Sequence, residues 1–382
     1  PSISDTKAPC GWGIALITRV AAMDLNQPCA PVPIAVELPG LAQLLECLQR
    51  RGFQVIGPTV REGAVVLDAI EKLDDLPAGW TDRQEPGCYR LERRDDGALF
   101  GFAPGPHSWK QFLHPPEATL CELAREGVSF RVLATPEPPP RRAFLGVRAC
   151  DLAAIRIQDR VLLEDRYVDT IYEVHRRGVL IVAVNCTQAS GTCFCVSMGT
   201  GPRVKGSFDL ALTELTGPNG HAFLVEAGSD LGAEVLGEID HRGARPEELA
   251  QASAALEGAT RQATRLDTAE LHRMLFGNLG HPEWDLVAAR CLSCGNCTMV
   301  CPTCFCTTVE DSSDVTGARA QRRRKWDSCF TESFSYIHGG SVRLSVKSRY
   351  RQWLTHKLAA WVDQFGTSGC VGCGRCITWC PA

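Results

Sequence analysis

Residues 291–302 have the sequence Cys-Leu-Ser-Cys-Gly-Asn-Cys-Thr-Met-Val-Cys-Pro, and this stretch decides how the carboxyl-terminal part of the chain folds. The pattern, C-x2-C-x2-C-x3-C-P, returns at 370–381 as Cys-Val-Gly-Cys-Gly-Arg-Cys-Ile-Thr-Trp-Cys-Pro. In this spacing, the first three thiolates lie on one tight loop and can bind three corners of one iron–sulfur cubane. The fourth thiolate lies further along, points away, and ligates the other cluster. The two runs therefore predict two [4Fe–4S] clusters that exchange ligands.

This exchange assigns four cysteines to each cluster. Glycines between the cysteines, such as Gly295, Gly372 and Gly374, leave backbone N–H groups free to bond cluster sulfur. The proline after the fourth cysteine ends the local turn. The expected ligands of the first cluster are Cys291, Cys294, Cys297 and Cys380, and those of the second cluster are Cys370, Cys373, Cys376 and Cys301.

Zinc is the alternative metal, because C-x2-C pairs also bind zinc. A zinc site of that kind uses two cysteine pairs separated by a long loop. Each run here instead holds four cysteines followed by proline, which favours iron–sulfur. A zinc-binding scaffold that assembles partners is the hypothesis from a non-redox class, and metal analysis separates the two.

Residues 302–369 form a long insertion between the two runs, whereas a minimal two-cluster ferredoxin joins its halves by a short loop. The insertion carries Cys304, Cys306 and Cys329, which could ligate a further centre. The simpler interpretation is that they are buried thiols packed near a cluster, since free cysteine is among the most buried residue types. The arginine run at 322–324 is most simply a solvated face, and positive charge beside an anionic cluster or an acidic partner is the alternative.

Two apolar runs further upstream, 143–147 and 179–184, flank a helical stretch, and this order predicts a βαβ unit with parallel neighbouring strands. The carboxyl ends of parallel strands share one edge of the sheet, where open α/β sheets bind ligands. Four cysteines follow these runs and would meet at that edge: Cys150, Cys186, Cys193 and Cys195. Spacing and topology leave two interpretations open, a third cluster and four reduced thiols. The remaining cysteines, Cys10, Cys29, Cys47, Cys88 and Cys121, are interpreted as core or surface thiols.

The chain as a whole is predicted to be a mixed α/β (α+β) protein in three parts. Residues 1–140 are expected to form an amino-terminal mixed α/β region that includes a hairpin over 88–102, turning at an Asp-Asp-Gly sequence. Residues 141–230 hold the βαβ unit, the candidate cluster site and a hairpin over 210–226. Residues 231–382 begin with a helical segment and end in a split two-cluster ferredoxin-like domain.

Composition narrows the function classes. The 382 residues are 45% hydrophobic and carry a net charge of −4, so no basic imbalance indicates nucleic acid as a partner. No apolar run reaches the roughly 18 residues of a transmembrane helix, so no membrane partner is expected. The 20 cysteines sit in a chain with a full apolar complement, and half of them are bunched at metal-ligand spacing. This usage favours a reducing compartment, and the expected location is the cytoplasm.

Several longer motifs run through roughly residues 85–382. They are Gly105-Pro-His-Ser-Trp-Lys110, Phe112 to Pro115, Gly146-Val-Arg-Ala-Cys-Asp151, Asn185-Cys186, Gly191-Thr-Cys-Phe-Cys195, Gly199-Thr-Gly-Pro202, Arg290 to Cys297, Val300 to Cys306, Trp326 to Phe330, and Gly372 to Cys376. In these motifs the chain resembles the iron–sulfur β subunit of soluble, NAD(P)-linked [NiFe] hydrogenases (sulfhydrogenases). That 4Fe–4S dicluster family is closely related to the iron–sulfur subunit of anaerobic sulfite reductase.

The resemblance implies a subunit that relays electrons and performs no bond chemistry itself. Its implied partners are a flavoprotein reductase subunit that binds FAD and NAD(P)H, and the small and large subunits of a [NiFe] hydrogenase. A sulfite reductase catalytic subunit with sirohaem is the alternative acceptor. The resemblance also favours the third cluster, because Cys150, Cys186, Cys193 and Cys195 fall within family motifs. No G-x-G-x-x-G after a strand and no P-loop occurs, so no nucleotide site and no catalytic residue is expected in this chain.

Overall fold

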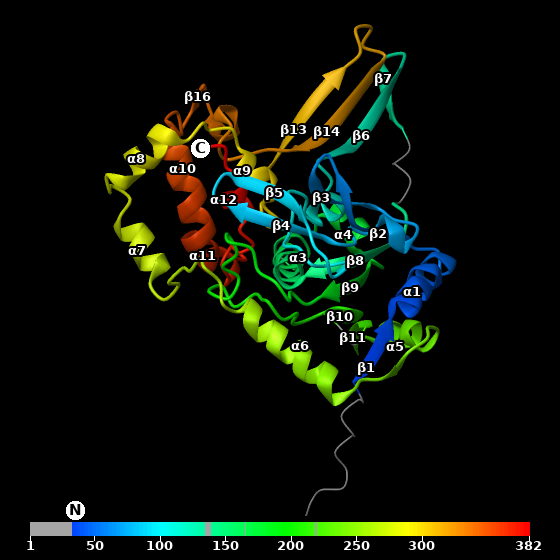
Figure 1. The fold of residues 1–382 in the computed structure, drawn as a ribbon. Helices are drawn as coiled ribbons and strands as arrows, with labels where there is room; N and C mark the ends of the chain where they lie inside the picture. The colour runs from blue at the N-terminus through cyan, green and yellow to red at the C-terminus, as the bar shows by residue number, and fades with distance from the viewer. Residues whose placement is uncertain (1–32, 134–138, 165, 218–219) are drawn as a thin grey trace, which may run out of the picture. The chain divides into compact units, whose positions relative to one another are not determined.

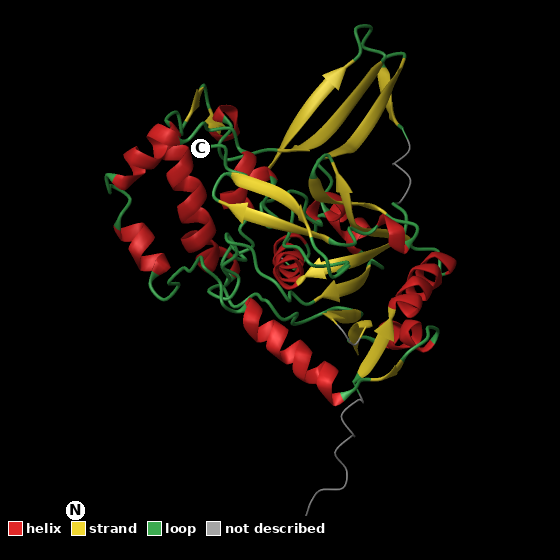
Figure 2. Cartoon of the chain, viewed as in Figure 1, coloured by secondary structure: helices red, strands yellow, loops and turns green. Residues whose placement is uncertain are grey.

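The computed structural model describes residues 33–382 except 134–138, 165 and 218–219 (Figure 1). Residues 1–32, which include Cys10 and Cys29, lie outside the described part of the chain. The described unit mixes helices and strands throughout, as Figure 2 shows. The predicted mixed α/β class is confirmed.

The largest element is an eight-stranded sheet with the order β12-β1-β11-β10-β9-β8-β2-β3. Its strands are β1 (Ile34–Glu37), β2 (Gln54–Arg61), β3 (Ala64–Ala69), β8 (Arg142–Arg148), β9 (Leu180–Val184), β10 (Leu210–Gly217), β11 (Gly220–Ala227) and β12 (Arg242–Gly243). The four central strands, β2, β8, β9 and β10, run parallel, and the outer strands pair antiparallel. Strands from both sides of residue 140 thus share one sheet.

The predicted βαβ unit is confirmed. Strands β8 and β9 pair in parallel, with Ala143 opposite Leu180. The chain between them forms α3 (Ala149–Leu162) and α4 (Thr170–Arg176). Gly146 lies at a bulge in β8 with a φ of 95°, a conformation that glycine adopts at little cost. The carboxyl ends of both strands therefore meet at one edge of the sheet.

Successive side chains of a strand point to opposite faces of the sheet. In the buried strands both sets of side chains are apolar, and helices cover both faces. Leu145 and Val182 face a core shared with α1 (Leu38–Arg50) and α5 (Asp230–Gly237). Phe144 and Ile181 face a second core with α3 and α4. Helix α6 (Pro246–Ala259) packs on β10 and β11.

One predicted hairpin is confirmed and the other is wrong. Strands β10 and β11 pair antiparallel over the predicted 210–226 region. The hairpin nearer the amino terminus comprises β4 (Trp80–Glu85) and β5 (Cys88–Arg93), and it turns at 86–87 with Gly87 at a φ of 69°. Residues 98–102 form no strand. The Asp-Asp-Gly sequence bends a loop instead, because Asp96 accepts a hydrogen bond from the Ala98 N–H at 3.2 Å.

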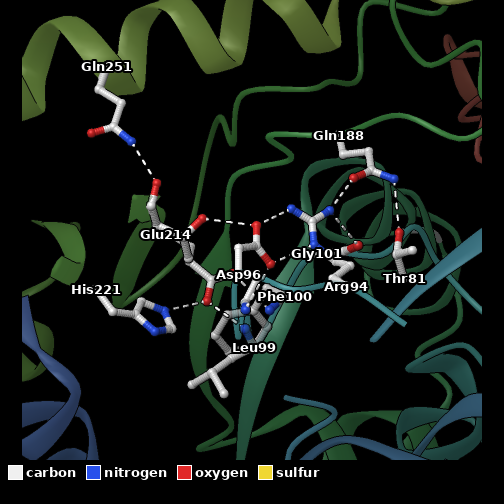
Figure 3. Close-up of polar contacts among 12 residues, drawn as sticks. Thr81, Arg94, Asp96, Leu99, Phe100, Gly101, Gln188, Glu214, His221 and Gln251 are labelled. Carbon is white, nitrogen blue, oxygen red and sulfur yellow. Dashed lines mark hydrogen bonds and ion pairs between the residues drawn. The ribbon is translucent and has the colours of Figure 1, made fainter. Parts of the chain in front are cut away.

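Polar contacts hold this loop in place (Figure 3). Arg94 pairs with Asp96 within the loop and donates to the Gln188 side-chain oxygen at 2.5 Å. The buried Glu214 carboxylate on β10 accepts two backbone N–H groups of the loop, at 2.6 Å and 2.8 Å. Gln188 lies in the segment after β9, so the network fixes the approach to the cysteines at 193 and 195.

A second sheet has the order β13-β14-β6-β7 and is antiparallel. It joins β6 (Glu117–Glu126) and β7 (Ser129–Val132) to β13 (Thr307–Ser313) and β14 (Arg319–Trp326) from the insertion. The expected solvated face at 322–324 holds for Arg322, which pairs with Asp311 in solvent. It does not hold for Arg324, which is 11% exposed and pairs with Asp169.

The predicted helical segment from 231 to 290 is confirmed, because it holds α5, α6, α7 (Leu271–Gly277) and α8 (Glu283–Arg290). The helices that follow are α9 (Asn296–Met299), α10 (Val346–Thr355), the π-helical turn His356–Ala360, α11 (Trp361–Phe365) and α12 (Arg375–Thr378). The smaller elements of the chain are the turns Leu73–Asp75 and Glu332–Ser335, α2 (Lys110–Leu113), β15 (Tyr336–Ile337) and β16 (Gly340–Ser341). Within the described residues, no helix is both long and apolar enough to cross a membrane.

Candidate iron–sulfur sites

The two half-motifs have the same local backbone. Gly295 precedes α9 and Gly374 precedes α12, with φ angles of 73° and 79° that favour glycine. Each short helix carries the third cysteine of its run, and the fourth cysteine follows the helix. The Asn296 side chain donates to the Trp379 carbonyl at 2.5 Å, and α9 packs on α12. The two runs, far apart in sequence, therefore lie side by side.

Equivalent N–H···S contacts occur in both runs. The Ser293 N–H donates to the Cys291 sulfur at 3.4 Å, and the Gly372 N–H donates to the Cys370 sulfur at 3.4 Å. Such bonds stabilise negative charge on ligand sulfur. The donor set fits an anionic iron–sulfur cluster at each loop, because it offers thiolate ligands and backbone N–H groups to the same centre.

The fourth cysteine of the first run lies among the thiols of the second run. The pKa of Cys370 is raised to about 12, mainly by burial, and the neighbouring thiols of Cys373 and Cys301 contribute to this increase. Burial also raises the pKa of Cys376, with Cys370, Cys373 and Cys301 as its first thiol neighbours. The fold therefore brings Cys301 to the loop at 370–376.

The Cys297 thiol lies near other thiols of its own run and near the Cys329 thiol of the insertion. Burial raises the pKa of Cys297, and the thiols of Cys329, Cys301, Cys291 and Cys294 raise it as well. Cys294 is exposed, while Cys291 and Cys380 are partly exposed. The Tyr350 phenol has a pKa raised to about 12, first by burial and then by Cys297, Cys376, Cys291 and Cys380. Tyr350 thus stands beside thiols of both runs.

The upstream cysteines are all buried at the predicted edge of the sheet. Cys150 lies in the first turn of α3, Cys186 follows β9, and Cys193 and Cys195 lie in the next loop, each at most 9% exposed. The pKa values of Cys193 and Cys195 are raised to about 11, mainly by burial, and the Cys186 thiol contributes to both increases. Cys150 has Cys195 and Cys373 as thiol neighbours. The fold thus brings the four upstream thiols together beside the second half-motif.

Polar side chains form hydrogen bonds with two of these sulfurs. The Gln262 amide donates to the Cys195 sulfur at 3.1 Å, and the Ser190 hydroxyl lies 3.1 Å from the Cys193 sulfur. Donors of this kind orient and stabilise metal-bound thiolates. The upstream set therefore also fits a sulfur-ligated centre. No group of three or more His, Cys, Asp or Glu side chains in the described ranges is placed to hold a single metal ion.

The upstream loop packs directly against the second half-motif. The Phe194 N–H donates to the Gly372 carbonyl at 2.8 Å, and the Thr192 and Thr378 hydroxyls lie 2.7 Å apart. A Cβ on Gly372 would lie 2.6 Å from backbone atoms of Phe194, so only glycine allows this approach. The two cysteine sites are therefore held in contact by backbone.

Buried cations beside the thiols were missed by sequence reasoning. Arg375 pairs with Asp151, and Lys357 donates to the Thr303 hydroxyl at 2.8 Å. Burial alone would lower the pKa of Lys357, but Cys301, Cys304 and Cys370 raise it above its ordinary value. Arg375 stands at a spacer position of a cysteine motif, and Lys357 lies in a helical run where lysine usually faces solvent.

Comparison with known proteins defines the class first. Residues 290–382 match the family model of the 4Fe–4S dicluster domain. Together with the paired half-motifs, this match makes the chain an iron–sulfur electron-transfer protein that binds [4Fe–4S] clusters.

The particular family follows from a curated relative. The chain is 35% identical over 252 residues to the beta subunit of sulfhydrogenase 2 from Pyrococcus furiosus, covering 63% of this chain and 70% of the relative. The chain belongs to the family of sulfhydrogenase beta subunits.

Proposed function

We propose that this chain relays electrons, in the cytoplasm, from a reductase subunit that binds FAD and NAD(P)H to a [NiFe] hydrogenase module made of small and large subunits, or in the reverse direction. The single observation that carries the proposal is the contact between the paired half-motifs and the upstream cysteine site. Electron tunnelling falls steeply with distance, so a relay needs its centres packed together. The backbone contact between Phe194 and Gly372 supplies that packing.

Each cluster is assigned its ligands by the exchange between runs. The first cluster takes Cys291, Cys294, Cys297 and Cys380, and the second takes Cys370, Cys373, Cys376 and Cys301. The position of Cys301 among the thiols of the second run supports this assignment. The third takes Cys150, Cys186, Cys193 and Cys195, supported by their common burial at one sheet edge.

The residues of this chain hold and tune the centres rather than react. Each bound cluster supplies one-electron redox chemistry. The N–H groups of Ser293 and Gly372 donate to ligand sulfur in the two runs. Arg375 and Lys357 place positive charge beside the ligands of the second cluster, which favours the reduced and more negative state.

Purification of the tagged chain with its native partners tests the proposal. Co-elution with nickel, a flavin and NAD(P)H-dependent reduction of a dye or protons is expected. Sirohaem absorbance without nickel would instead establish the sulfite reductase alternative and overturn the hydrogenase assignment. Stoichiometric zinc without iron would overturn both.

Cys297→Ser in the same complex tests the route itself. The serine weakens one cluster, so turnover from NAD(P)H through the complex should fall at least about tenfold while flavin reduction persists. Cys121→Ser, in β6 and outside all three sets, is the matched control and should leave turnover unchanged. Undiminished turnover in Cys297→Ser would contradict a route through this cluster.

A further inference from the structure

The two cysteine loops share one backbone but differ in what covers them. Leu292 and Val371 hold the same position, directly after the first cysteine of each run. The next residues, Ser293 and Gly372, both have a left-handed φ, at 54° and 65°. Val371 is 2% exposed, whereas Leu292 is 67% exposed. The face of the second loop that carries this residue is therefore buried within the chain, and the equivalent face of the first loop is open.

The upstream cysteine site covers the second loop. Val371 belongs to an apolar core that includes Cys150 and Cys195. The Phe194 N–H donates to the Gly372 carbonyl at 2.8 Å, so the contact is also made by backbone. In this chain, the buried face of a cysteine loop is thus the place where a neighbouring candidate redox site packs.

We propose that the open face of the first loop is the docking surface for a partner subunit that carries its own one-electron redox centre beside the contact. The inference rests on the proposed relay and adds to it the place where electrons leave or enter the chain. At the second loop the chain supplies the neighbouring site itself. No described segment of the chain buries Leu292 in the same way, so another protein supplies the neighbouring centre there.

The first cluster is the assigned centre that reaches this surface. Cys294, one of its assigned ligands, directly follows Ser293 and is exposed, whereas Cys373 at the equivalent position of the second loop is buried. Electron tunnelling falls steeply with distance. A centre on a partner that docks over this loop therefore exchanges electrons with the first cluster before either of the other two.

The surface around the loop is apolar. Leu286 precedes the loop at the end of α8, and the other exposed apolar side chains follow it in the segment from β15 to α10. Patches of exposed apolar side chains are rare on monomeric proteins and mark protein–protein interfaces. The side chains that define this apolar patch are each at least 56% exposed: Leu286, Leu292, Tyr336, Ile337, Val342 and Leu344.

Polar contacts bring the segments of the apolar patch together. The Ser293 hydroxyl donates to the Phe330 carbonyl at 3.5 Å, which ties the cysteine loop to the segment before β15. The Lys347 ammonium group donates to the Asp285 carboxylate at 2.8 Å and holds the start of α10 against α8. Since β16 leads directly into α10, the residues after β16 lie beside α8, and Figure 1 shows these three elements grouped together.

The charges around the apolar patch favour a stably bound subunit over a mobile electron carrier. A mobile partner is steered by an excess of one sign of charge, whereas the interface of a permanent subunit depends on apolar contact. In the segments 283–294 and 332–347 the formal charges cancel, so neither sign is in excess. The acidic side chains are Glu283, Asp285 and Glu332, and the basic ones are Arg290, Arg343 and Lys347.

Leu344→Glu in the tagged chain, purified with its native partners, tests the proposal. A carboxylate in the apolar patch should lower the amount of one co-purifying redox subunit at least about tenfold. Iron content and the EPR signals of the dithionite-reduced chain should stay unchanged, which shows that the fold and the clusters are intact. Val315→Glu is the matched control, because Val315 is an equally exposed apolar residue between β13 and β14, and this variant should retain every subunit.

Photo-crosslinking of the purified complex identifies the occupant. Benzoylphenylalanine in place of Leu344 should link this chain to a subunit that contains flavin, iron–sulfur or nickel, identified by mass spectrometry. A link to a second copy of this chain, a link to a subunit without a redox cofactor, or no link at all would overturn the proposal. Full retention of every subunit by Leu344→Glu would overturn it as well.

The unmodified complex separates a failure of this inference from a failure of the relay. If the unmodified complex contains nickel and flavin and reduces a dye with NAD(P)H while the Leu344 experiments fail, the relay stands and only the docking surface is wrong. If the unmodified chain purifies without any partner, both the relay and the docking surface are wrong.

Discussion

The guanidinium group of Arg375 donates to both carboxylate oxygens of Asp151, at 2.8 Å and 3.0 Å, and the two side chains are only 2% and 4% exposed. Asp151 follows Cys150 in α3, and Arg375 lies between Cys373 and Cys376. The pair therefore ties the upstream cysteine site to the second half-motif. Burial alone would lower the pKa of Arg375, but Asp151 and Cys373 hold it above its ordinary value.

Removing one partner should destabilise the protein more than removing both. Arg375→Met and Asp151→Asn each leave a buried charge or polar group unpaired, at a cost of about 3–5 kcal/mol in unfolding free energy for the charged case. The double variant should be more stable than Arg375→Met alone. Thermal unfolding of the three purified variants checks this, and strictly additive losses would refute the coupling.

Glycine at 374 should be required for the contact between the two sites. Gly374→Ala places a Cβ 2.6 Å from the Thr192 carbonyl oxygen, in addition to the strain of a φ of 79°. Gly317→Ala is the matched control, with a φ of 67° and no atom within 4 Å. We expect Gly374→Ala to lose cluster iron on purification and Gly317→Ala to retain it. Equal iron in both would show that the contact is dispensable.

Lys357 should raise the potential of the second cluster. Lys357→Met removes a buried positive charge beside Cys301 and Cys370, so reduction becomes less favourable. A loss of about 1.4 kcal/mol corresponds to about 59 mV for one electron, and a shift of that order toward lower potential is expected. Lys347→Met, in α10 and paired with Asp285, is the control. EPR-monitored redox titration measures both, and equal midpoints would contradict the prediction.

His114 should make stability depend on pH. Its pKa is lowered to about 4, mainly by burial, with Arg324 and Lys110 contributing to the decrease and Asp169 opposing it. On acidification from about pH 6.5 to about 4, the unfolded chain binds a proton that the native chain does not, so stability falls in this window by at most about 3 kcal/mol. His114→Phe should show a smaller drop in melting temperature between about pH 7 and 5. An identical drop in both proteins would exclude His114 as the cause.

Local patterns in the sequence were enough for the cysteine half-motifs and the βαβ unit. The thiol spacing encodes the loop that binds a cluster, and two apolar runs flanking a helix encode parallel strands. The predicted turn of the hairpin near residue 90 was wrong because this segment contains two sequences typical of turns, one at Gly87 and one at 95–97. The hairpin turns at Gly87, whereas Asp96 accepts a hydrogen bond within a loop.

No local sequence pattern predicts which strands pair when they are far apart in the chain. The pairing of β14 with β6 joins residues about two hundred positions apart, with Arg319 opposite Ala124, and nothing local in either strand specifies it. The placement of Lys357 and Arg375 beside thiols likewise depends on tertiary contacts between segments that are far apart in sequence. These buried charges beside the candidate ligands were therefore found only in the structure.

EPR of the anaerobically purified, dithionite-reduced chain tests the central claim most directly, because two cubanes that exchange ligands must lie close together. We predict the signals of two reduced [4Fe–4S] clusters, split by magnetic interaction, with the splitting lost in Cys297→Ser. A colourless sample that is silent after reduction, or two signals without interaction, would contradict the exchange of ligands between the two runs.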